Sequence, residues 1–322
     1  MSLADLAIVG AGPVGLAAAY EARRLGLSAV LLEARRPAAS LEGFPARMTF
    51  FSEARKIEVG GVPLAAVGAK PSREEALVYY RALAERLPFP VLTRARAVRV
   101  EGAFGAMRVV YEGSEGAGEV WARAVVVATG YFFNPRRLGV PGEELPFVQY
   151  GYRDALDHWL ERVLVVGGSN SAVEAALDLL RAGARVTLVH RGEGVRSGVK
   201  YWLRPDFENR VREGAIEALY RHRVVAFEPG RALLQGPGGA RTLAVDRAVV
   251  LIGYRADDAV LRASGVRYRG DAPELSEHFE TSVPGLFVVG SAGYGSATGS
   301  VFIENGREHA RVAVAEVARR LS

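Results

Sequence analysis

The feature that most constrains the fold of this chain is an internal repeat. Residues 6–36, LAIVGAGPVGLAAAYEARRLGLSAVLLEARR, align without a gap with residues 163–193, VLVVGGSNSAVEAALDLLRAGARVTLVHRGE. Each copy has a short apolar run, a turn of small residues, an amphipathic stretch that stops at a glycine (Gly26 or Gly183), and a second apolar run. This order predicts two βαβ units, and therefore an α/β chain that contains the same device twice.

The turn of the first copy has the composition of a dinucleotide-binding turn. Gly10 allows the sharp corner, Gly12 lets a pyrophosphate approach the backbone, and Gly15 lets the helix pack against the strand. The pyrophosphate would lie on free N–H groups at the helix N-terminus, where the dipole favours negative charge. Glu33 ends the next strand, where an acid accepts hydrogen bonds from an adenosine ribose. The alternative is a glycine turn that only packs a sheet.

The turn of the second copy is also made of small residues. Ser169 replaces the second glycine and Ala172 replaces the third. The candidate nucleotide-binding residues of this turn are Gly167, Gly168, Ser169, Asn170 and Ser171. Both exchanges keep the residue small, so the second unit is also predicted to bind a dinucleotide.

The end of the second copy predicts a different nucleotide. His190 stands at the register of Glu33, with Arg191 next to it and Arg196 nearby. An acid there would repel a 2′-phosphate, whereas arginine forms charge-assisted bonds worth roughly 1.5–3 kcal/mol, or about 10- to 150-fold in affinity. We therefore expect His190, Arg191 and Arg196 to select NADPH over NADH. The alternative is that the two arginines are ordinary surface charges.

Two dinucleotide sites in one chain predict hydride transfer between two cofactors. The first site, which ends in an acid, suits FAD, because its adenosine ribose carries no 2′-phosphate. Similar apolar runs, AVVVATG at 124–130 and AVVLIGY at 248–254, flank the second repeat copy and indicate where the chain leaves the first domain and returns to it. We expect an FAD-binding domain made of residues 1–130 and 254–322, and an inserted NADPH-binding domain at 131–253.

Residues 284–321 predict a final strand, a glycine-rich loop and a closing helix that begins near Ser300. The positive end of this helix would face the pyrimidine edge of a flavin, where negative charge accumulates on reduction. Alternatively, the helix only seals the sheet. The adjacent Phe50 and Phe51 suit either a flavin wall or the core.

Composition excludes several other classes of protein. The 322 residues contain no cysteine, which rules out disulfides, cysteine-ligated metal sites and a thiol nucleophile. Five scattered histidines without HExxH spacing predict no metal site, and GGSNS lacks the glycine that follows the nucleophile of a hydrolase elbow. The neighbours Asp154, Asp157 and His158 are interpreted as a solvated helix face or a linker.

Charge and hydropathy indicate a soluble protein. The net charge is +5, but arginines are interspersed with acids in stretches such as REEALVYYRALAER, which favours a solvated surface over nucleic-acid binding. No apolar run reaches the roughly 18–20 residues of a membrane span, and the N-terminus lacks the pattern of a secretory signal. We expect a cytoplasmic protein with no nucleic-acid or membrane partner.

The chain resembles the thioredoxin-reductase-like flavoproteins, and among them the bacillithiol-disulfide reductase (bacilliredoxin reductase, YpdA-type) family. The resemblance runs from end to end through GAGPVGLAAA, MTFFSEARKIEVGGVP, REEALVYYR, ATGYFFNPRRLGVPGEELP, VVGGSNSAVEAALDLLRAGARVTLVHRG, VKYWLRPDFENRVREGAI and FIENGREHA. It implies an α/β fold of two Rossmann-like, three-layer ββα dinucleotide-binding domains with thioredoxin-reductase-like architecture. It also implies an oxidoreductase that uses FAD and NADPH and forms a homodimer or higher homo-oligomer.

The resemblance also assigns flavin-site residues by position. The residues so assigned are Gly10, Gly12, Pro13, Val14, Gly15, Glu33, Thr49, Phe50, Ala128, Thr129, Gly130, Gly290 and Ser291. Val98, and Ser300 at the expected start of the closing helix, are further candidates for the flavin site. Ser291 stands where flavoproteins of this kind have aspartate, so one contact to the ribityl chain is expected to be weaker or made differently.

Val14 departs from the family at the position that matters most for disulfide chemistry. The family's disulfide reductases carry a cysteine there, in GPCG beside the flavin. Ordinary thioredoxin reductases instead carry CxxC in the NADPH domain, and the corresponding stretch here, VQYGYRDALDHWLERV, has none. Val14 can pack, and its N–H can serve a phosphate, but it cannot form a mixed disulfide.

The sequence therefore predicts an FAD-dependent NADPH:acceptor oxidoreductase in which the flavin itself is the catalytic group. The expected acceptor is a quinone, a free flavin, a metal ion or a small electron carrier such as ferredoxin or flavodoxin. Two alternatives stay open: a low-molecular-weight disulfide reductase that works without cysteine, and a non-catalytic sensor that binds flavin and NADPH.

Overall fold

The computed structural model describes residues 3–114 and 116–322, and the chain divides into two compact units. Unit 1 is Met1–Asn134 together with Tyr254–Ser322, and unit 2 is Pro135–Gly253. Each unit contains one copy of the sequence repeat.

The sheet of unit 1 has a parallel part and an antiparallel part that share one long strand. Its order is β3-β2-β1-β6-β5-β4, and β17 also pairs with β6. The strands are β1 (Ala4–Val9), β2 (Ala29–Glu33), β3 (Val91–Thr93), β4 (Ala95–Ala103), β5 (Ala106–Gly113), β6 (Gly116–Val127) and β17 (Leu286–Val288). The second half of β6 pairs in parallel with β1 and β17, whereas its first half pairs antiparallel with β5. Val100 of β4 and Val109 of β5 share one buried core with residues of β1 and β2, so the antiparallel strands cover one face of the parallel ones.

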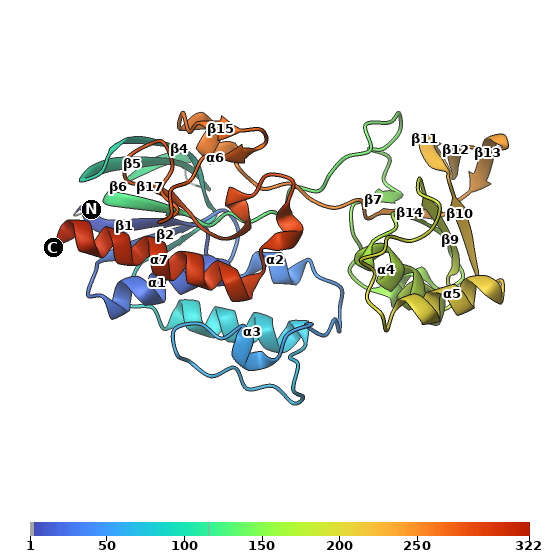
Figure 1. The fold of residues 1–322 in the computed structure, drawn as a ribbon, viewed down its shortest axis with the longest axis horizontal. Helices are drawn as coiled ribbons and strands as arrows, with labels where there is room; N and C mark the ends of the chain where they lie inside the picture. The colour runs from blue at the N-terminus through green and yellow to red at the C-terminus, as the bar shows by residue number, and fades with distance from the viewer. Residues whose placement is uncertain (1–2, 115) are drawn as a thin grey trace. The chain divides into compact units, whose positions relative to one another are not determined.

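Helices cover the opposite face of the parallel strands in unit 1. They are α1 (Pro13–Arg24), α2 (Ala39–Glu42), α3 (Arg73–Glu85) and α7 (Ile303–Leu321). Figure 1 shows α1 and α7 side by side, with α3 on the same side of the sheet. The buried apolar residues of α1, α3 and α7 form one core with Leu6, Ile8 and Leu31.

Short elements complete unit 1. The helix α6 (Ala259–Ala263) packs on β4, where Val260 and Leu261 join the core between the two parts of the sheet. The 3₁₀ turns are η1 (Ala54–Lys56), η3 (Gly290–Gly293) and η4 (Thr298–Ser300), and β15 (Tyr268–Arg269) pairs with β16 (Ala272–Pro273) in a small antiparallel hairpin.

The start of α3 illustrates how local sequence sets an element boundary. The Ser72 side chain accepts a hydrogen bond from Glu75 N–H (3.2 Å), and the Glu75 carboxylate accepts one from Ser72 N–H (2.7 Å). This capping box satisfies two backbone donors that a helix start otherwise leaves unpaired.

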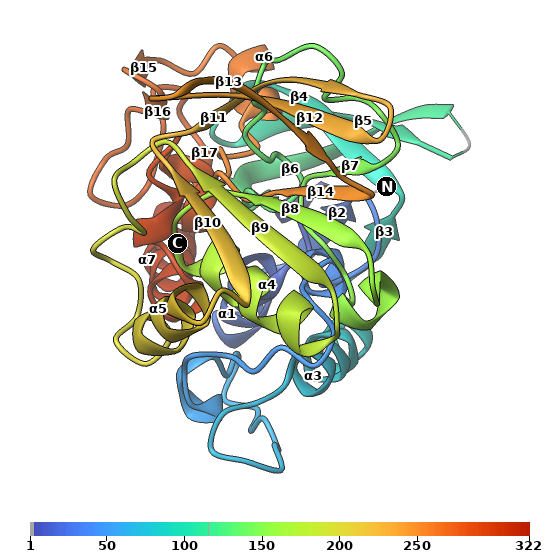
Figure 2. The same cartoon turned by 90° about the vertical axis from the view of Figure 1, so that its right-hand side faces the viewer.

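Unit 2 repeats the three-layer plan on a smaller scale. Its five-stranded sheet is parallel throughout, in the order β10-β9-β8-β14-β7. Its elements are β7 (Val148–Gln149), η2 (Ala155–His158), β8 (Arg162–Val166), α4 (Asn170–Arg181), β9 (Arg185–His190), α5 (Arg204–Arg212), β10 (Ile216–Tyr220), β11 (Arg223–Glu228), β12 (Arg231–Gly236), β13 (Gly239–Ala244) and β14 (Arg247–Val250). Figure 2 shows α4 and α5 on one side of this sheet and the antiparallel β11-β12-β13 on the other.

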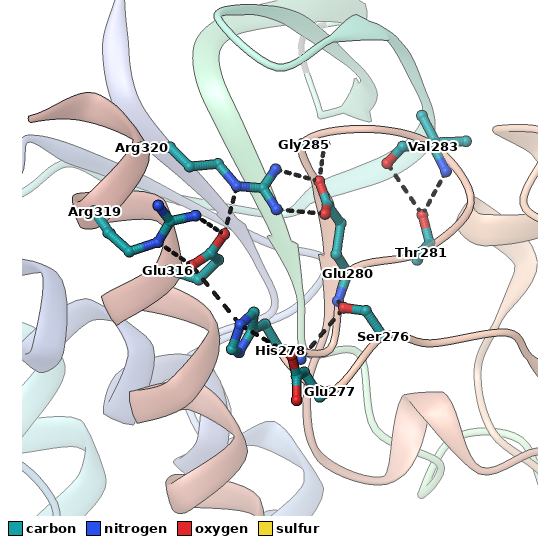
Figure 3. Close-up of polar contacts among 10 residues, drawn as sticks. All are labelled: Ser276, Glu277, His278, Glu280, Thr281, Val283, Gly285, Glu316, Arg319 and Arg320. Atoms are coloured by element: carbon teal, nitrogen blue, oxygen red, sulfur yellow. Dashed lines mark hydrogen bonds and ion pairs between the residues drawn. The ribbon is translucent and has the colours of Figure 1, made fainter.

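An ion-pair network fastens the C-terminal end of α7 to the loop before β17 (Figure 3). Arg320 donates to both oxygens of Glu280 (2.7 and 2.6 Å) and to Glu316 (2.6 Å). Arg319 also donates to Glu316 (2.7 Å). The bonds from the two arginines lower the pKa of Glu316, which is almost fully buried, to about 2. The network lies at the C-terminal end of α7, away from the N-terminus of this helix, and holds the helix on unit 1.

Within residues 3–114 and 116–322, no helix is both long enough and apolar enough to cross a membrane.

Candidate functional site

The first small-residue turn joins β1 to α1, and two of its glycines are required by the chain's own packing. Gly10 has a φ of +106°, and a Cβ there would lie 2.6 Å from the carbonyl oxygen of Ala128. A Cβ on Gly15 would lie 1.9 Å from the carbonyl oxygen of Gly10. Both positions must therefore be glycine for the strand and helix to meet as they do.

Gly12 differs, because no atom of residues 3–114 and 116–322 requires it to be glycine. Its φ and ψ are −76° and −179°, which any residue adopts, and a Cβ there would meet no atom within 4 Å. Gly12 is the N-cap of α1, which has no side-chain cap and no acid in its first turn. The free N–H groups and the space beside Gly12 thus fit the diphosphate of a dinucleotide.

Glu33 connects the end of β2 to this turn. Its two carboxylate oxygens accept the N–H groups of Ala11 (2.8 Å) and Arg35 (2.8 Å). Burial raises the pKa of Glu33, although the two N–H groups and nearby arginines oppose the shift. A carboxylate has about four acceptor sites, so two remain for the hydroxyls of a ribose.

Ala128, Thr129 and Gly130 form the start of the segment that leaves the unit 1 sheet after β6. Ala128 N–H donates to the Val9 carbonyl (2.8 Å). The Thr129 hydroxyl donates to the Asp257 carbonyl (2.6 Å), and Asp257 N–H donates to the Gly130 carbonyl (2.8 Å). The outgoing and returning segments of unit 1 are therefore bonded to each other at the carboxyl end of the sheet.

An aromatic cluster that the sequence did not reveal surrounds these segments. Its members are Phe44, Phe50, Tyr131, Phe132, Phe133 and Tyr254. The Phe132 ring stacks on Tyr254 (centroids 5.6 Å apart, 23° between planes) and lies 5.0 Å from Phe44. Burial raises the pKa of Tyr131 and of Tyr254. In the sequence, only the run YFF that follows ATG indicates an aromatic cluster. Tyr254, which packs on Tyr131 and Phe132, is too distant in the chain for a local pattern to connect it with that run.

Thr49, Phe50 and Val98, which are also predicted for the flavin site, lie in unit 1. Thr49 forms an isolated bridge with Ser72, and Phe50 is half-buried and contacts Phe44, whereas Phe51 is exposed. Val98 is half-buried in β4, where the pairing with β5 shifts register.

Val14, in the first turn of α1, packs against two glycines from the C-terminal part of the chain. A Cβ on Gly290 would lie 3.3 Å from both Val14 methyl groups, and a Cβ on Gly306 would lie 2.8 Å from one of them. Ser291 follows Gly290, and its hydroxyl lies 4.0 Å from the position that a Cβ of Gly130 would take. Position 14 is therefore next to the first turns of α7 and to the glycine that follows β17.

The closing helix starts later than the sequence predicts. It begins at Ile303, whereas Ser300 ends the preceding 3₁₀ turn, with its hydroxyl donating to the Ala297 carbonyl (2.7 Å). The physical reason is Asn305, whose side chain accepts Phe302 N–H (2.7 Å) and donates to the Ser300 carbonyl (2.9 Å). This bridge fixes the helix start at residue 303.

The second turn joins β8 to α4 in unit 2. A Cβ on Gly167 would lie 2.4 Å from the Leu251 carbonyl, and a Cβ on Gly168 would lie 2.6 Å from ring atoms of His190. Ser169 is the N-cap of α4 and makes no side-chain capping bond, and Ser171 in the first turn is exposed. The helix start is thus free of side-chain caps, as in the first turn.

The arginines after β9 carry free positive charge next to this turn. Arg191 and Arg196 are exposed, and neither forms an ion pair within the described part of the chain. Arg196 N–H donates to the Gly168 carbonyl (2.8 Å). Burial, and then the charges of Arg191 and Arg196, lower the pKa of His190. Together these residues fit an anionic phosphate and leave the imidazole neutral at neutral pH.

The sequence interpretation of His158 is wrong. His158 is buried in η2 rather than solvated, and its Nδ1 lies 2.7 Å from a carboxylate oxygen of Glu161. Asp154 is the N-cap of this 3₁₀ turn, and its carboxylate accepts Leu156 N–H (3.0 Å). Across the described ranges, no group of three His, Asp or Glu side chains is arranged to hold a metal ion.

Comparison with known proteins agrees with this geometry. A family model described as pyridine nucleotide-disulphide oxidoreductase matches residues 7–290. The chain is 33% identical to bacilliredoxin reductase Bdr of Bacillus subtilis over 317 residues, which are 97% of each protein. It is 28% identical to a ferredoxin–NADP reductase of Ignicoccus hospitalis over 300 residues, which are 89% of each.

Solved structures give the same result. The bacillithiol disulfide reductase Bdr (YpdA) of Bacillus cereus superposes with a TM-score of 0.94 at 32% identity, covering 99% of this chain and 100% of that one. Thioredoxin reductase of Lactococcus lactis superposes with a TM-score of 0.78 at 20% identity, covering 98% of each chain. The predicted thioredoxin-reductase-like α/β fold is confirmed.

These likenesses, together with the two nucleotide turns, make the chain a flavin-dependent oxidoreductase that uses FAD and NADPH. The predicted resemblance is confirmed. The chain itself has no cysteine among its 322 residues. The chain belongs to the pyridine nucleotide-disulphide oxidoreductase family and, within it, to the bacilliredoxin reductase (YpdA-type) group.

Proposed function

We propose that this chain is an NADPH:acceptor oxidoreductase in which electrons pass from FAD to the acceptor without a protein thiol. The observation that carries the proposal is Val14, whose methyl groups lie beside Gly290 and Gly306 in a chain that contains no cysteine. Bound NADPH and FAD supply hydride transfer and the onward transfer of one or two electrons. A valine cannot attack a disulfide or hold a mixed disulfide, so the acceptor must react with the flavin directly.

The residues of each turn have separate roles in this proposal. Gly12 and the N–H groups at the start of α1 hold the FAD diphosphate, and Glu33 accepts the hydroxyls of its adenosine ribose. Ser169 and the start of α4 hold the NADPH diphosphate, and Arg191 and Arg196 hold its 2′-phosphate. The support is the free space at Gly12 and the two exposed guanidinium groups after β9.

The proposed acceptor is a quinone, a free flavin, a metal ion or a small electron carrier. The likeness to a protein named ferredoxin–NADP reductase favours the carrier. The test is anaerobic reduction of the FAD-loaded protein by NADPH in a stopped-flow instrument, followed by mixing with each acceptor class and with bacillithiol disulfide. We expect fast reoxidation by at least one of the four classes and slow reoxidation by the disulfide; fast reoxidation by the disulfide alone would contradict the proposal.

Reduction of a low-molecular-weight disulfide is the second candidate, favoured by the likeness to bacillithiol disulfide reductases. In that reaction one disulfide, one NADPH and one proton yield two thiols and NADP⁺. Val14→Cys distinguishes the two candidates, because it supplies the missing thiol beside Gly290. Under our proposal the variant gains disulfide turnover that the natural chain lacks; equal turnover by both proteins would favour the second candidate.

A redox sensor would behave differently from either enzyme. NADPH would reduce it, but every acceptor would reoxidise it slowly. A cytoplasmic location and a homodimer complete the proposal, and sedimentation of the purified chain tests the second of these.

A further inference from the structure

The segment between β9 and α5 begins with residues 191–200, which contain no helix or strand and carry both arginines of the second site. We call residues 191–200 the arginine loop. It folds back onto the turn that opens α4, because Arg196 N–H donates to the Gly168 carbonyl (2.8 Å). The loop is therefore held at a fixed place relative to the nucleotide turn.

Asn170, the first residue of α4, fastens the far end of the arginine loop. Its side-chain oxygen accepts Lys200 N–H (2.9 Å), and its side-chain nitrogen donates to the Gly198 carbonyl (3.3 Å). Both ends of the amide are thus engaged by the main chain of the loop. The sequence predicts Asn170 as one of the nucleotide-binding residues, and in the structure its side chain bonds to the loop.

Arg204, at the start of α5, provides a second fastening. Its guanidinium donates to the Arg196 carbonyl (2.7 Å) and reaches the Val195 carbonyl (3.5 Å). The main chain of Arg196 therefore has its N–H bonded to Gly168 and its carbonyl bonded to Arg204. Only the exposed Arg196 side chain retains freedom to move.

We propose that Asn170 is a positioning residue that holds the arginine loop, and with it Arg196, where a 2′-phosphate binds. A group that is ordered before binding loses less entropy when the ligand arrives, so a fastened loop binds the phosphate more tightly than a free one. Asn170 then contributes to the preference for NADPH over NADH without contacting the cofactor. This inference rests on the proposed role of the arginines, and the experiment separates the two.

The experiment measures binding of 2′,5′-ADP, which carries the 2′-phosphate, and of 5′-ADP, which lacks it, by titration calorimetry on the full FAD-loaded chain. Asn170→Ala should weaken 2′,5′-ADP binding about three- to tenfold and leave 5′-ADP binding unchanged. Arg196→Ala should weaken 2′,5′-ADP binding more, by about tenfold or greater.

The double variant Asn170→Ala/Arg196→Ala decides how Asn170 acts. If Asn170 acts through Arg196, the double variant binds 2′,5′-ADP no more weakly than Arg196→Ala alone. If the two losses multiply, or if Asn170→Ala weakens both ligands equally, Asn170 contacts the nucleotide itself and the inference is wrong. Hydrogen exchange gives a readout independent of ligand: the Lys200 and Arg196 amides should lose protection in Asn170→Ala.

Two controls keep the result interpretable. Asn209→Ala removes an exposed asparagine of α5 whose side chain bonds only to Arg212 in the described structure, and both ligands should bind it as they bind the natural chain. Arg204→Met releases the loop at Val195 and Arg196, so it should reproduce the selective loss even if Asn170→Ala does not fold. If Arg191→Ala and Arg196→Ala both leave 2′,5′-ADP binding unchanged, the proposed phosphate site fails. If Arg196→Ala is selective and Asn170→Ala is not, only the positioning role fails.

Discussion

At the end of the second strand of each repeat copy, unit 1 has the carboxylate of Glu33 and unit 2 has the imidazole of His190. Glu33 accepts Ala11 N–H and so bonds directly to the main chain of its turn. His190 instead packs its ring against Gly168, and the arginine loop bonds to that turn through Arg196 N–H. One backbone plan thus carries two turns flanked by side chains of opposite charge, and in our proposal these side chains decide which nucleotide each turn accepts.

The largest expected effect comes from filling the space beside one turn at a time. Gly12→Val adds a side chain whose Cβ would meet no atom of the described residues within 4 Å, so the chain should fold but purify without FAD. Ser169→Val, at the same register in unit 2, should purify with FAD and bind NADPH poorly. Visible absorption measures FAD content, and NADP⁺ titration measures the second site.

The reference for folding in this pair is natural protein stripped of FAD, because bound cofactor itself stabilises the folded state. The Gly12→Val protein should unfold within about 1 kcal/mol of that reference. If both variants lost FAD, or neither did, the two turns would not serve separate nucleotides.

The next largest effect concerns charge in the second pocket. Arg191→Ala should raise the KM for NADPH about 10- to 150-fold, because a charge-assisted bond to the 2′-phosphate is lost. The KM for NADH should stay unchanged, since NADH has no phosphate there. Equal changes for both nucleotides would refute the role of Arg191.

A smaller effect is expected in the first pocket from Glu33→Gln. The amide presents one acceptor where the carboxylate presents two, so FAD affinity should fall by about tenfold. Because burial raises the pKa of Glu33, the natural chain should lose FAD on acidification at a higher pH than an ordinary carboxyl would cause. The sign follows because the ionised form accepts the ribose hydroxyls and protonation removes that acceptor. FAD retention by Glu33→Gln should not show this pH dependence.

The smallest effect on FAD or NADPH affinity is expected from a substitution far from both turns. Arg320→Met removes the bonds from Arg320 to Glu280 and Glu316, and should lower the free energy of unfolding by about 1–3 kcal/mol without changing FAD or NADPH affinity. Denaturant titration of the FAD-stripped proteins measures the loss.

The same network gives a pH dependence with a definite sign. The pKa of Glu316 is lowered to about 2 in the folded protein, so its contribution to stability is present above its unfolded value near 4.5 and is lost as the pH falls toward 2. Glu316→Gln should flatten that part of the stability profile. An unchanged profile would mean that the network contributes nothing.

The features best predicted from the sequence are those that depend on local steric contacts. The turns follow from glycines whose missing side chains face backbone atoms, as at Gly10 and Gly15, and such a pattern is visible in the residues alone. The aromatic cluster was not predictable, because Tyr254 reaches Phe132 only after the chain has passed through unit 2 and returned. The bonds from the Asn170 side chain to Gly198 and Lys200 were not predictable, since these residues reach it through a loop without regular structure. α7 begins at Ile303 and not at Ser300 because the Asn305 side chain bridges Phe302 N–H and the Ser300 carbonyl, a contact that residue patterns do not reveal.

Anaerobic titration of the FAD-loaded chain with NADPH, and in parallel with NADH, tests the central claim that two differently charged pockets serve one redox reaction. The account predicts that the visible flavin absorption is lost at one NADPH per bound FAD, and that NADH needs a far higher concentration for the same change. A purified chain that takes up no FAD, or bound FAD whose absorption neither nucleotide alters, would contradict it.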